Sequence, residues 1–185
     1  RYAGLTVLDA QGREAPAWLE AEPGRLSIVV DDRNLDYPLV IDPFIQKAKL
    51  TASDGAAGDA FGYSVSISGD TVVVGAYGDD SGKGSAYVFV RPSGSWANLT
   101  QTAKLTASDG VAFDIFGYSV SIDGDTVVVG AYLHHSSRGS ALVFVKPVTG
   151  WADMTETAKL TATDGAVNDH FGYSVSISGD TVVVG

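Results

Sequence analysis

Residues 61–77 read Phe-Gly-Tyr-Ser-Val-Ser-Ile-Ser-Gly-Asp-Thr-Val-Val-Val-Gly-Ala-Tyr, and this stretch decides the fold. It returns at residues 116–132 with one substitution, and its first fifteen positions return unchanged at residues 171–185. The copies are 55 residues apart, without an insertion or deletion. A fixed period of this size is typical of a supersecondary unit repeated in tandem, whose copies bury their apolar faces against one another.

Each 55-residue unit contains four β-like segments. Residues 48–52 and 85–90 are short strand-like runs that end at a turn dipeptide and before Pro92, respectively. Residues 63–68 alternate between apolar residues and serine, which is the period of a half-buried strand. Residues 71–77 are apolar on both faces, as in a central strand. Four antiparallel strands at a period near 50 predict one blade of a β-propeller.

The same pattern predicts how the blades stack. Gly62, Gly75 and Ala76 lack bulk, so their strands can approach the axis closely. We expect Phe61 to wedge between neighbouring blades, because a single blade leaves its apolar face uncovered. The small serine face of one sheet is then expected to lie against the bulky face of the next. No segment shows helical apolar spacing.

Residues 1–45 do not take part in the repeat. Residues 17–21 and 25–30 are β-like and are separated by a turn, and residues 37–43 form a further extended segment. We interpret this region as the C-terminal part of a β-sandwich-like domain. Residues 46–185 then form two blades and part of a third, so we predict an all-β partial propeller with four-stranded antiparallel blades. Further blades of the same chain are expected, because this number leaves strand edges unpaired.

The composition argues against several classes of function. The net charge of −10 disfavours nucleic acid and anionic membranes as partners, because both are negatively charged and bind proteins through Lys and Arg. The sequence has no cysteine, and therefore neither a thiolate metal site nor a thiol nucleophile. It has no run of about 18 apolar residues, so membrane insertion is not expected. No histidine recurs beside the repeated serines, so we expect a protein without enzymatic activity.

Residues 61–65 followed by residues 74–77 resemble the FG-GAP repeat of integrin α-subunit propellers. The bacterial variant is the closer match, because Ala-Lys-Leu-Thr-Ala-Ser-Asp-Gly precedes the Phe-Gly pair and Gly-Ser-Ala-Tyr-Val-Phe follows it. Residues 37–43 similarly resemble the end of a domain that precedes repeats in bacterial surface proteins. The resemblance implies a propeller on a secreted or cell-surface bacterial protein, which binds or adheres to a protein or glycan.

Two other functions stay open. The repeats could be structural spacers in a large surface protein, which predicts no ligand at the loops that vary between copies. They could instead form an accessory propeller of a secreted hydrolase, which predicts paired carboxylates facing one pocket.

The integrin type of the repeat carries Asp-x-Asp-x-Asp-Gly, which holds calcium. Here the corresponding loops are residues 68–70, 123–125 and 178–180, too short for the roughly six to eight oxygen ligands of calcium. We therefore expect no required cofactor, and Ca²⁺ only at other carboxylates. Those candidate metal ligands are Asp54, Asp59, Asp109, Asp114, Asp164 and Asp169. The alternative is that each carboxylate caps backbone N–H groups of its own turn.

The differences between copies concentrate in two loops, residues 56–60 and 78–83 and their counterparts. In an up-and-down blade these loops lie at the same end, and the near-constant Gly-Asp hairpins lie at the other. We hypothesise that the variable end contacts the ligand, and we expect an exposed Phe–Ile pair there. The candidate ligand-binding residues are Phe113, Ile115, His134, His135, Asn168, His170, Asp79 and Asp80.

The exchange of Asp79 and Asp80 for His134 and His135 indicates a free surface loop rather than a ligand cage. A histidine pair can hold zinc, but adjacent residues on an extended loop point apart, which disfavours a zinc site here. We expect His170 to be exposed.

Overall fold

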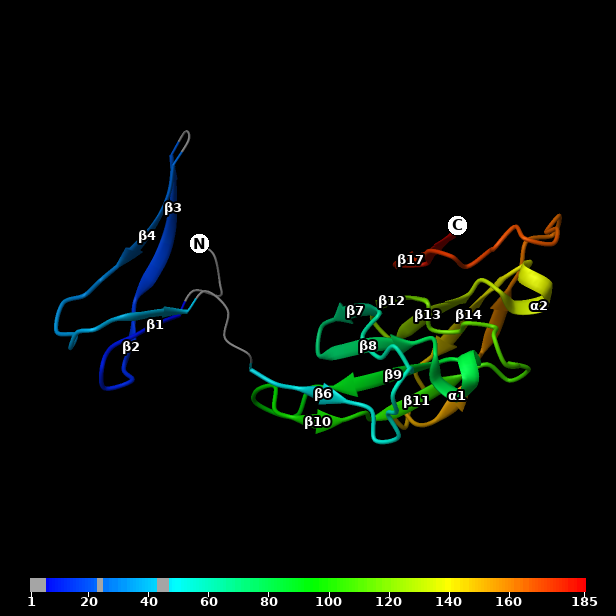
Figure 1. Cartoon of the computed structure of the whole chain (residues 1–185), viewed down its shortest axis with the longest axis horizontal. Coiled ribbons are helices and arrows are strands. Elements are labelled where there is room, and N and C mark those ends of the chain that lie inside the picture. Colours follow the sequence, from blue (N-terminus) through cyan, green and yellow to red (C-terminus); the bar gives the residue numbers. More distant parts are fainter. Residues whose placement is uncertain (1–5, 23–24, 43–46) are drawn as a thin grey trace. The chain divides into compact units, whose positions relative to one another are not determined.

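A computed structural model describes residues 6–22, 25–42 and 47–185. Figure 1 shows the chain, which divides into two units, Arg1–Lys47 and Ala48–Gly185. The predicted boundary between residues 45 and 46 lies outside the described residues. The described part is all-β apart from two one-turn helices.

The first unit contains a three-stranded sheet and a β-hairpin. The sheet has the antiparallel order β2-β1-β5 and is formed by β1 (Thr6–Leu8), β2 (Glu14–Ala15) and β5 (Val40–Asp42). The hairpin pairs β3 (Ala17–Glu22) with β4 (Arg25–Val30), which confirms the two predicted strands. That these strands end a sandwich-like domain stays a prediction.

The second unit is a partial β-propeller built from the repeats. The first blade has the order β15-β11-β9-β8-β7. Its strands are β7 (Ser64–Ser68), β8 (Thr71–Ala76), β9 (Ser85–Val90), β11 (Ala103–Thr106) and β15 (Met154–Thr155). The second blade has the order β12-β13-β14-β16. Its strands are β12 (Ser119–Asp123), β13 (Thr126–Ala131), β14 (Ser140–Val145) and β16 (Ala158–Leu160). The third copy contributes the hairpin of β17 (Val175–Ser178) and β18 (Thr181–Val184).

The segment that opens each repeat in sequence forms the outer strand of the preceding blade. β11 opens the second repeat, yet it pairs with β9 of the first blade. The equivalent strand one repeat earlier, β6 (Leu50–Thr51), pairs in parallel with β10 (Leu99–Thr100), which lies in the link after β9. β15 adds to β11 in the same way. These short link strands, which the sequence analysis did not predict, join each copy to the outer strand of the copy before it.

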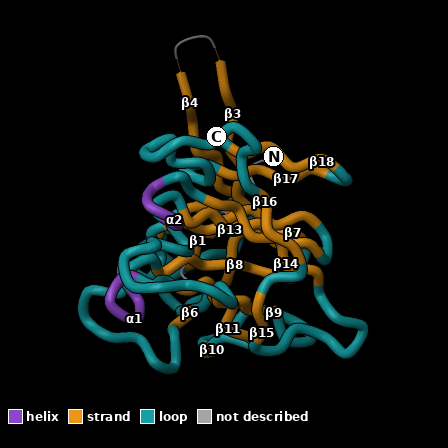
Figure 2. Tube along the Cα trace, turned by 90° about the vertical axis from the view of Figure 1, so that its right-hand side faces the viewer, coloured by secondary structure: helices purple, strands orange, loops and turns teal. Residues whose placement is uncertain are grey.

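The two one-turn helices, α1 (Asp79–Gly82) and α2 (His134–Ser137), follow the central strands β8 and β13. They were not predicted, because neither has an apolar helical stripe. The second residue of each helix has a left-handed backbone conformation. The angles are φ 49° and ψ 51° at Asp80, and φ 51° and ψ 57° at His135. They are therefore tight turns that need no such stripe. Figures 1 and 2 show both turns at the same end of their blades.

The apolar face of the second blade packs on the serine face of the first. Val120 and Ile122 are 9% and 5% exposed, whereas their counterparts Val65 and Ile67, over which the described chain places no sheet, are 66% and 62% exposed. Burying two such side chains contributes roughly 1.5–3 kcal/mol each. The Ile122 N–H also donates to Ser66 Oγ at 3.2 Å. The expected contact between small and bulky faces is confirmed.

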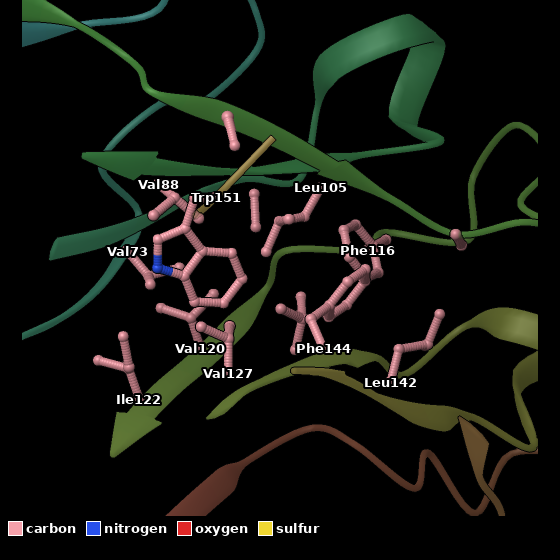
Figure 3. Packing of buried hydrophobic residues seen from close by; sticks show 14 of the residues in the cluster. Val73, Val88, Leu105, Phe116, Val120, Ile122, Val127, Leu142, Phe144 and Trp151 are labelled. Atoms are coloured by element: carbon pink, nitrogen blue, oxygen red, sulfur yellow. The ribbon is translucent and has the colours of Figure 1, made fainter. Parts of the chain in front are cut away.

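Aromatic residues fill the space between the blades. Phe116, the counterpart of Phe61, is fully buried, and its ring centroid lies 5.9 Å from that of Phe144 in an edge-on arrangement. Figure 3 shows Trp151, from the link after β14, among valines of both blades, with Val73 on the first-blade side. The predicted wedge is therefore confirmed, and the link supplies a second aromatic residue to the same core.

Glycine is required where neighbouring backbones touch. A Cβ atom on Gly75 would lie 2.0 Å from the carbonyl oxygen of Gly117, and one on Gly130 would lie 1.9 Å from that of Gly172. Close approach at the central strand is thus confirmed. Gly62 differs, because no atom lies within 4 Å of its Cβ position, and its φ of 90° is what favours glycine.

Gly130→Ala should lower the free energy of unfolding by about 3 kcal/mol, because the new methyl group would overlap the backbone carbonyl oxygen of Gly172. Gly124→Ala is the matched control, since no atom lies within 4 Å of its Cβ position and only its φ of 54° opposes alanine. That control should cost about 1 kcal/mol. Urea denaturation followed by circular dichroism measures both variants, and equal losses would contradict the close approach.

Candidate functional site

The loops that vary between copies lie together at one end of the blades, as expected. β7 and β8 are antiparallel, so the loop before β7 lies beside the loop after β8. Loops of adjacent copies also touch, since the His170 N–H donates to the Ser137 carbonyl oxygen at 3.0 Å. We call this region the variable-loop end; it comprises residues 52–63 and 77–84, their counterparts 107–118 and 132–139 in the second copy, and residues 162–173 in the third.

Three of the candidate metal aspartates cap their own turns. Oδ2 of Asp59, Asp114 and Asp169 accepts a hydrogen bond from the backbone N–H three residues earlier, at 2.6, 2.8 and 2.6 Å, respectively. Asp59 and Asp114 are buried. Their carboxylates therefore hold the loop in shape, as the alternative interpretation proposed. Asp164, the counterpart of Asp54, is exposed.

In the first blade, Asp54 and Asp79 converge on Lys104. The Lys104 Nζ atom lies 2.6 Å from Asp54 Oδ2 and 2.7 Å from Asp79 Oδ2. The Ser85 hydroxyl donates to Asp79 at 2.5 Å, and the Tyr87 hydroxyl donates to Asp54 at 3.0 Å. Burial by itself lowers the pKa of Lys104, but its hydrogen bonds to the two carboxylates outweigh burial and raise the pKa above its usual value. An ammonium group thus occupies the space between the carboxylates.

The second blade keeps this frame and changes the side chains. His134 stands where Asp79 stood and is only 2% exposed, so the expectation of a free surface loop is wrong. Its Nδ1 lies 2.8 Å from Ser140 Oγ. Its Nε2 lies 3.4 Å from Asp109 Oδ1 and 3.9 Å from Asp114 Oδ2. The strand and turn positions equivalent to those of the first blade therefore place an imidazole beside two carboxylates.

Lys159 is the counterpart of Lys104 and forms an ion pair with Asp109, with Glu156 Oε1 3.7 Å from its Nζ. The hydrogen bond from Lys159 lowers the pKa of Asp109. Burial lowers the pKa of His134, because the charged ring loses hydration. Burial therefore favours the neutral form of the His134 ring, and the Lys159 ammonium favours the ionised form of the neighbouring Asp109 carboxylate.

His135 lies against His134 rather than pointing away from it. The ring centroids are 3.9 Å apart and the planes are inclined by 30°. The expected divergence assumed an extended loop, whereas His135 has left-handed φ and ψ that fold the turn back. His135 Nε2 lies 3.9 Å from Asp109 Oδ2. The structure thus brings together Asp109, His134 and His135, while Asp80, the counterpart of His135, is exposed.

The remaining candidate ligand-binding residues differ in exposure. Phe113 is 71% exposed, as expected, and Asn168 at the same loop position is also exposed. Ile115 is half-buried, so the expected exposed Phe–Ile pair is reduced to Phe113. His170 is half-buried too, and its ring packs edge-on against Tyr132 at 5.5 Å, which corrects its expected exposure.

A groove of about 470 Å³ opens between the α2 turn, residues 135–139, and the loop of residues 161–167. The first junction differs there, because the Cε atom of Lys83 lies 3.1 Å from the position that a Cβ atom on Gly110 would take. The lysine side chain therefore lies over the equivalent loop. Equivalent junctions of the propeller consequently present different shapes.

A row of tyrosines also lies at the variable-loop end. The hydroxyl of Tyr118 is 2.9 Å from that of Tyr63 and 3.1 Å from that of Tyr173. Tyr77 packs edge-on against Tyr63, with ring centroids 4.8 Å apart, and Tyr132 packs likewise against Tyr118 at 4.6 Å. Hydrogen bonds to the neighbouring hydroxyls raise the pKa of Tyr118. The sequence analysis missed this row, although tyrosine recurring every 55 residues was a usable signal.

Comparison with known proteins adds one match. The model of the FG-GAP repeat family matches residues 44–89, 99–144 and 154–185. No curated protein matches the chain. Within residues 6–22, 25–42 and 47–185, no helix has the length and apolar character needed to cross a membrane.

Lys104→Met should lower the free energy of unfolding by about 2 kcal/mol, because buried Asp79 loses its counter-charge while Asp54 remains partly solvated. Lys49 is the equivalent residue one repeat earlier and is exposed, so Lys49→Met is the matched control. That control should change stability by less than about 0.5 kcal/mol. Thermal unfolding at pH 7 measures both variants. A similar loss in each would show that the lysine has no special role in the first blade.

Proposed function

Because the chain belongs to the FG-GAP repeat family, we propose that it is a non-catalytic binding module of an extracellular or cell-surface bacterial protein. The module contacts a protein or glycan ligand through the variable-loop end. The observation that carries this proposal is where the copies differ. Changes gather in the loops at that end and in the links around Trp96 and Trp151, while the Gly-Asp hairpins at the other end are nearly constant.

One loop position shows the pattern most directly. Gly58, Phe113 and Asn168 occupy the same place in successive copies, with φ of 100°, 70° and 70°. The backbone conformation is therefore kept while the exposed side chain changes. A left-handed conformation costs a non-glycine residue about 1–2 kcal/mol, so phenylalanine is a poor choice for stability here. An exposed aromatic residue kept at such a position supports a role in contact with a partner.

The surroundings of this position suit a protein or glycan ligand. The tyrosine row provides aromatic faces with hydroxyl groups, a combination that favours interfaces because one side chain offers both apolar area and hydrogen bonds. The groove beside His135 gives a recess at the same end. The net charge of −10 is unsuited to nucleic acid and to anionic membranes.

Phe113→Gly should raise the free energy of unfolding by about 1 kcal/mol, because glycine has no steric penalty at a positive φ. Glycine already stands at this position in the first copy, as Gly58. Asn168→Gly is the control and should give a smaller gain, since asparagine tolerates the left-handed region. Chemical denaturation measures both. A loss of stability in Phe113→Gly would show that the phenylalanine serves folding instead of binding.

Binding should be measured by biolayer interferometry of the whole chain against arrayed defined glycans and purified extracellular matrix proteins. We expect any ligand found to bind Phe113→Gly at least about tenfold more weakly, as for a central aromatic contact. Asp125→Asn, in a hairpin at the other end, should leave affinity unchanged. The proposed surface would be overturned if Phe113→Gly left the affinity for the ligand unchanged while Asp125→Asn abolished binding. Absence of any ligand would favour the structural-spacer function.

A further inference from the structure

The cluster of Asp109, His134 and His135 occurs in only one of the two blades that the structure describes in full. In the first blade the equivalent positions hold Asp54, Asp79 and Asp80. The backbone frame is the same, because α1 and α2 have the same φ and ψ pattern. The second blade therefore carries two imidazoles on a turn that elsewhere carries carboxylates.

The donor atoms of the cluster have the spacing of a metal site. His134 Nε2 lies 3.4 Å from Asp109 Oδ1, and His135 Nε2 lies 3.9 Å from Asp109 Oδ2. Donor atoms from all three side chains lie within 4.8 Å of one another. A tetrahedral ion with bonds of about 2.1 Å separates its ligand atoms by about 3.4 Å. Small side-chain rotations would therefore suffice for coordination.

His134 is held in the orientation that a ligand requires. Its ring is buried, and Ser140 Oγ engages Nδ1 at 2.8 Å. Nε2 is then the nitrogen that faces the carboxylates of Asp109 and Asp114, and within the described part of the chain it makes no hydrogen bond. In the tautomer with the proton on Nδ1, the Nε2 lone pair and the carboxylate oxygens of Asp109 can coordinate one cation placed between them. Metal-binding histidines typically donate their other ring N–H to a neighbouring acceptor, and Ser140 Oγ can accept such a bond from His134 Nδ1.

The ammonium group of Lys159 now supplies the positive charge by pairing with Asp109. A second acceptor, Glu156 Oε1, lies 3.7 Å from its Nζ. Lys159 can therefore release Asp109 to an incoming ion and keep a carboxylate partner. In the first blade Lys104 bridges Asp54 and Asp79 directly, so that cluster is already neutralised without an imidazole.

We propose that Asp109, His134 and His135 bind one divalent transition-metal ion of the zinc class. Imidazole nitrogen suits Zn²⁺, Co²⁺, Ni²⁺ and Cu²⁺, whereas Ca²⁺ requires a fuller set of oxygen ligands. Asp114 Oδ2, 3.9 Å from His134 Nε2, lies close enough to support the site from the buried side. His135 and Asp109 are exposed, so the ion has a path from solvent and keeps a position for water.

The test is isothermal titration calorimetry of the tag-free 185-residue chain with ZnCl₂, with CaCl₂ as the comparison ion. We expect one zinc ion per chain and no measurable calcium binding. Co²⁺ should give the visible absorption of a tetrahedral complex, which reports on the ligand set directly. The proposal would be overturned if the chain did not bind zinc, or if it bound calcium with the same affinity as zinc.

His134→Asp combined with His135→Asp reproduces the residues of the first blade and should fold, because that blade folds with them. Zinc affinity should fall by more than the roughly 10–100-fold that loss of an outer-shell partner costs. The reciprocal variant, Asp79→His with Asp80→His, should raise the stoichiometry from one to two. Unchanged zinc binding in the first variant would contradict the ligand assignment, and an unchanged stoichiometry in the second would contradict the role of the shared frame.

Lys159→Gln separates a metal site from a purely structural cluster. Removing the competing ammonium group from Asp109 should strengthen zinc binding by about tenfold, or about 1.4 kcal/mol. Lys146→Gln, which removes a lysine at the opposite end of the same blade, should leave zinc affinity unchanged. A structural role alone predicts equal zinc affinity in the two lysine variants, and that result would place the ion elsewhere.

Discussion

The structure depends on one constraint, which is that the apolar face of a blade is completed only by the next copy. Val120 and Ile122 are buried because the first blade lies over them, whereas Val65 and Ile67 have the same sequence context and remain exposed. Burial is thus a property of the pair of copies and not of the single repeat. The serine face is what makes the pairing close, because small side chains let one sheet lie directly on the next and also hydrogen bond its backbone.

The strand exchange at the outer edge serves the same constraint. A blade closes with the first segment of the following repeat, and the link strand at the end of that same repeat then pairs with this segment. Trp151 enters the core from the same link. Copies are therefore joined by side-chain packing near the centre and by backbone pairing at the edge.

Much of this fold was predictable from the sequence, because the pattern of apolar and small residues is periodic. The alternation of residues 63–68 gave the strand and its two faces, and the 55-residue period gave the stacking partner. The two-residue link strands were not predictable, since so short a pairing leaves no pattern. The α1 and α2 turns were missed for a related reason. Their shape comes from left-handed residues such as Asp80 and His135, not from apolar spacing.

The candidate site was predictable in place but not in chemistry. Loop variation pointed to the end of the blades where Asp109, His134 and His135 come together, yet the burial of His134 depends on the tight turn and on strands far away in sequence. The tyrosine row depends on the repeat itself, which turns equal positions into neighbours.

The placement of equivalent residues side by side affects how such a chain can lengthen during evolution. The hydrogen bonds that Tyr63, Ser64 and Ser66 form with the second blade join residues 55, 53 and 56 positions apart, respectively. Duplicating any 55-residue window in a gene would add another unit with the same set of neighbours, wherever the copying began. The architecture therefore tolerates lengthening without redesign, and each added unit brings a fresh pair of loops that can diverge independently.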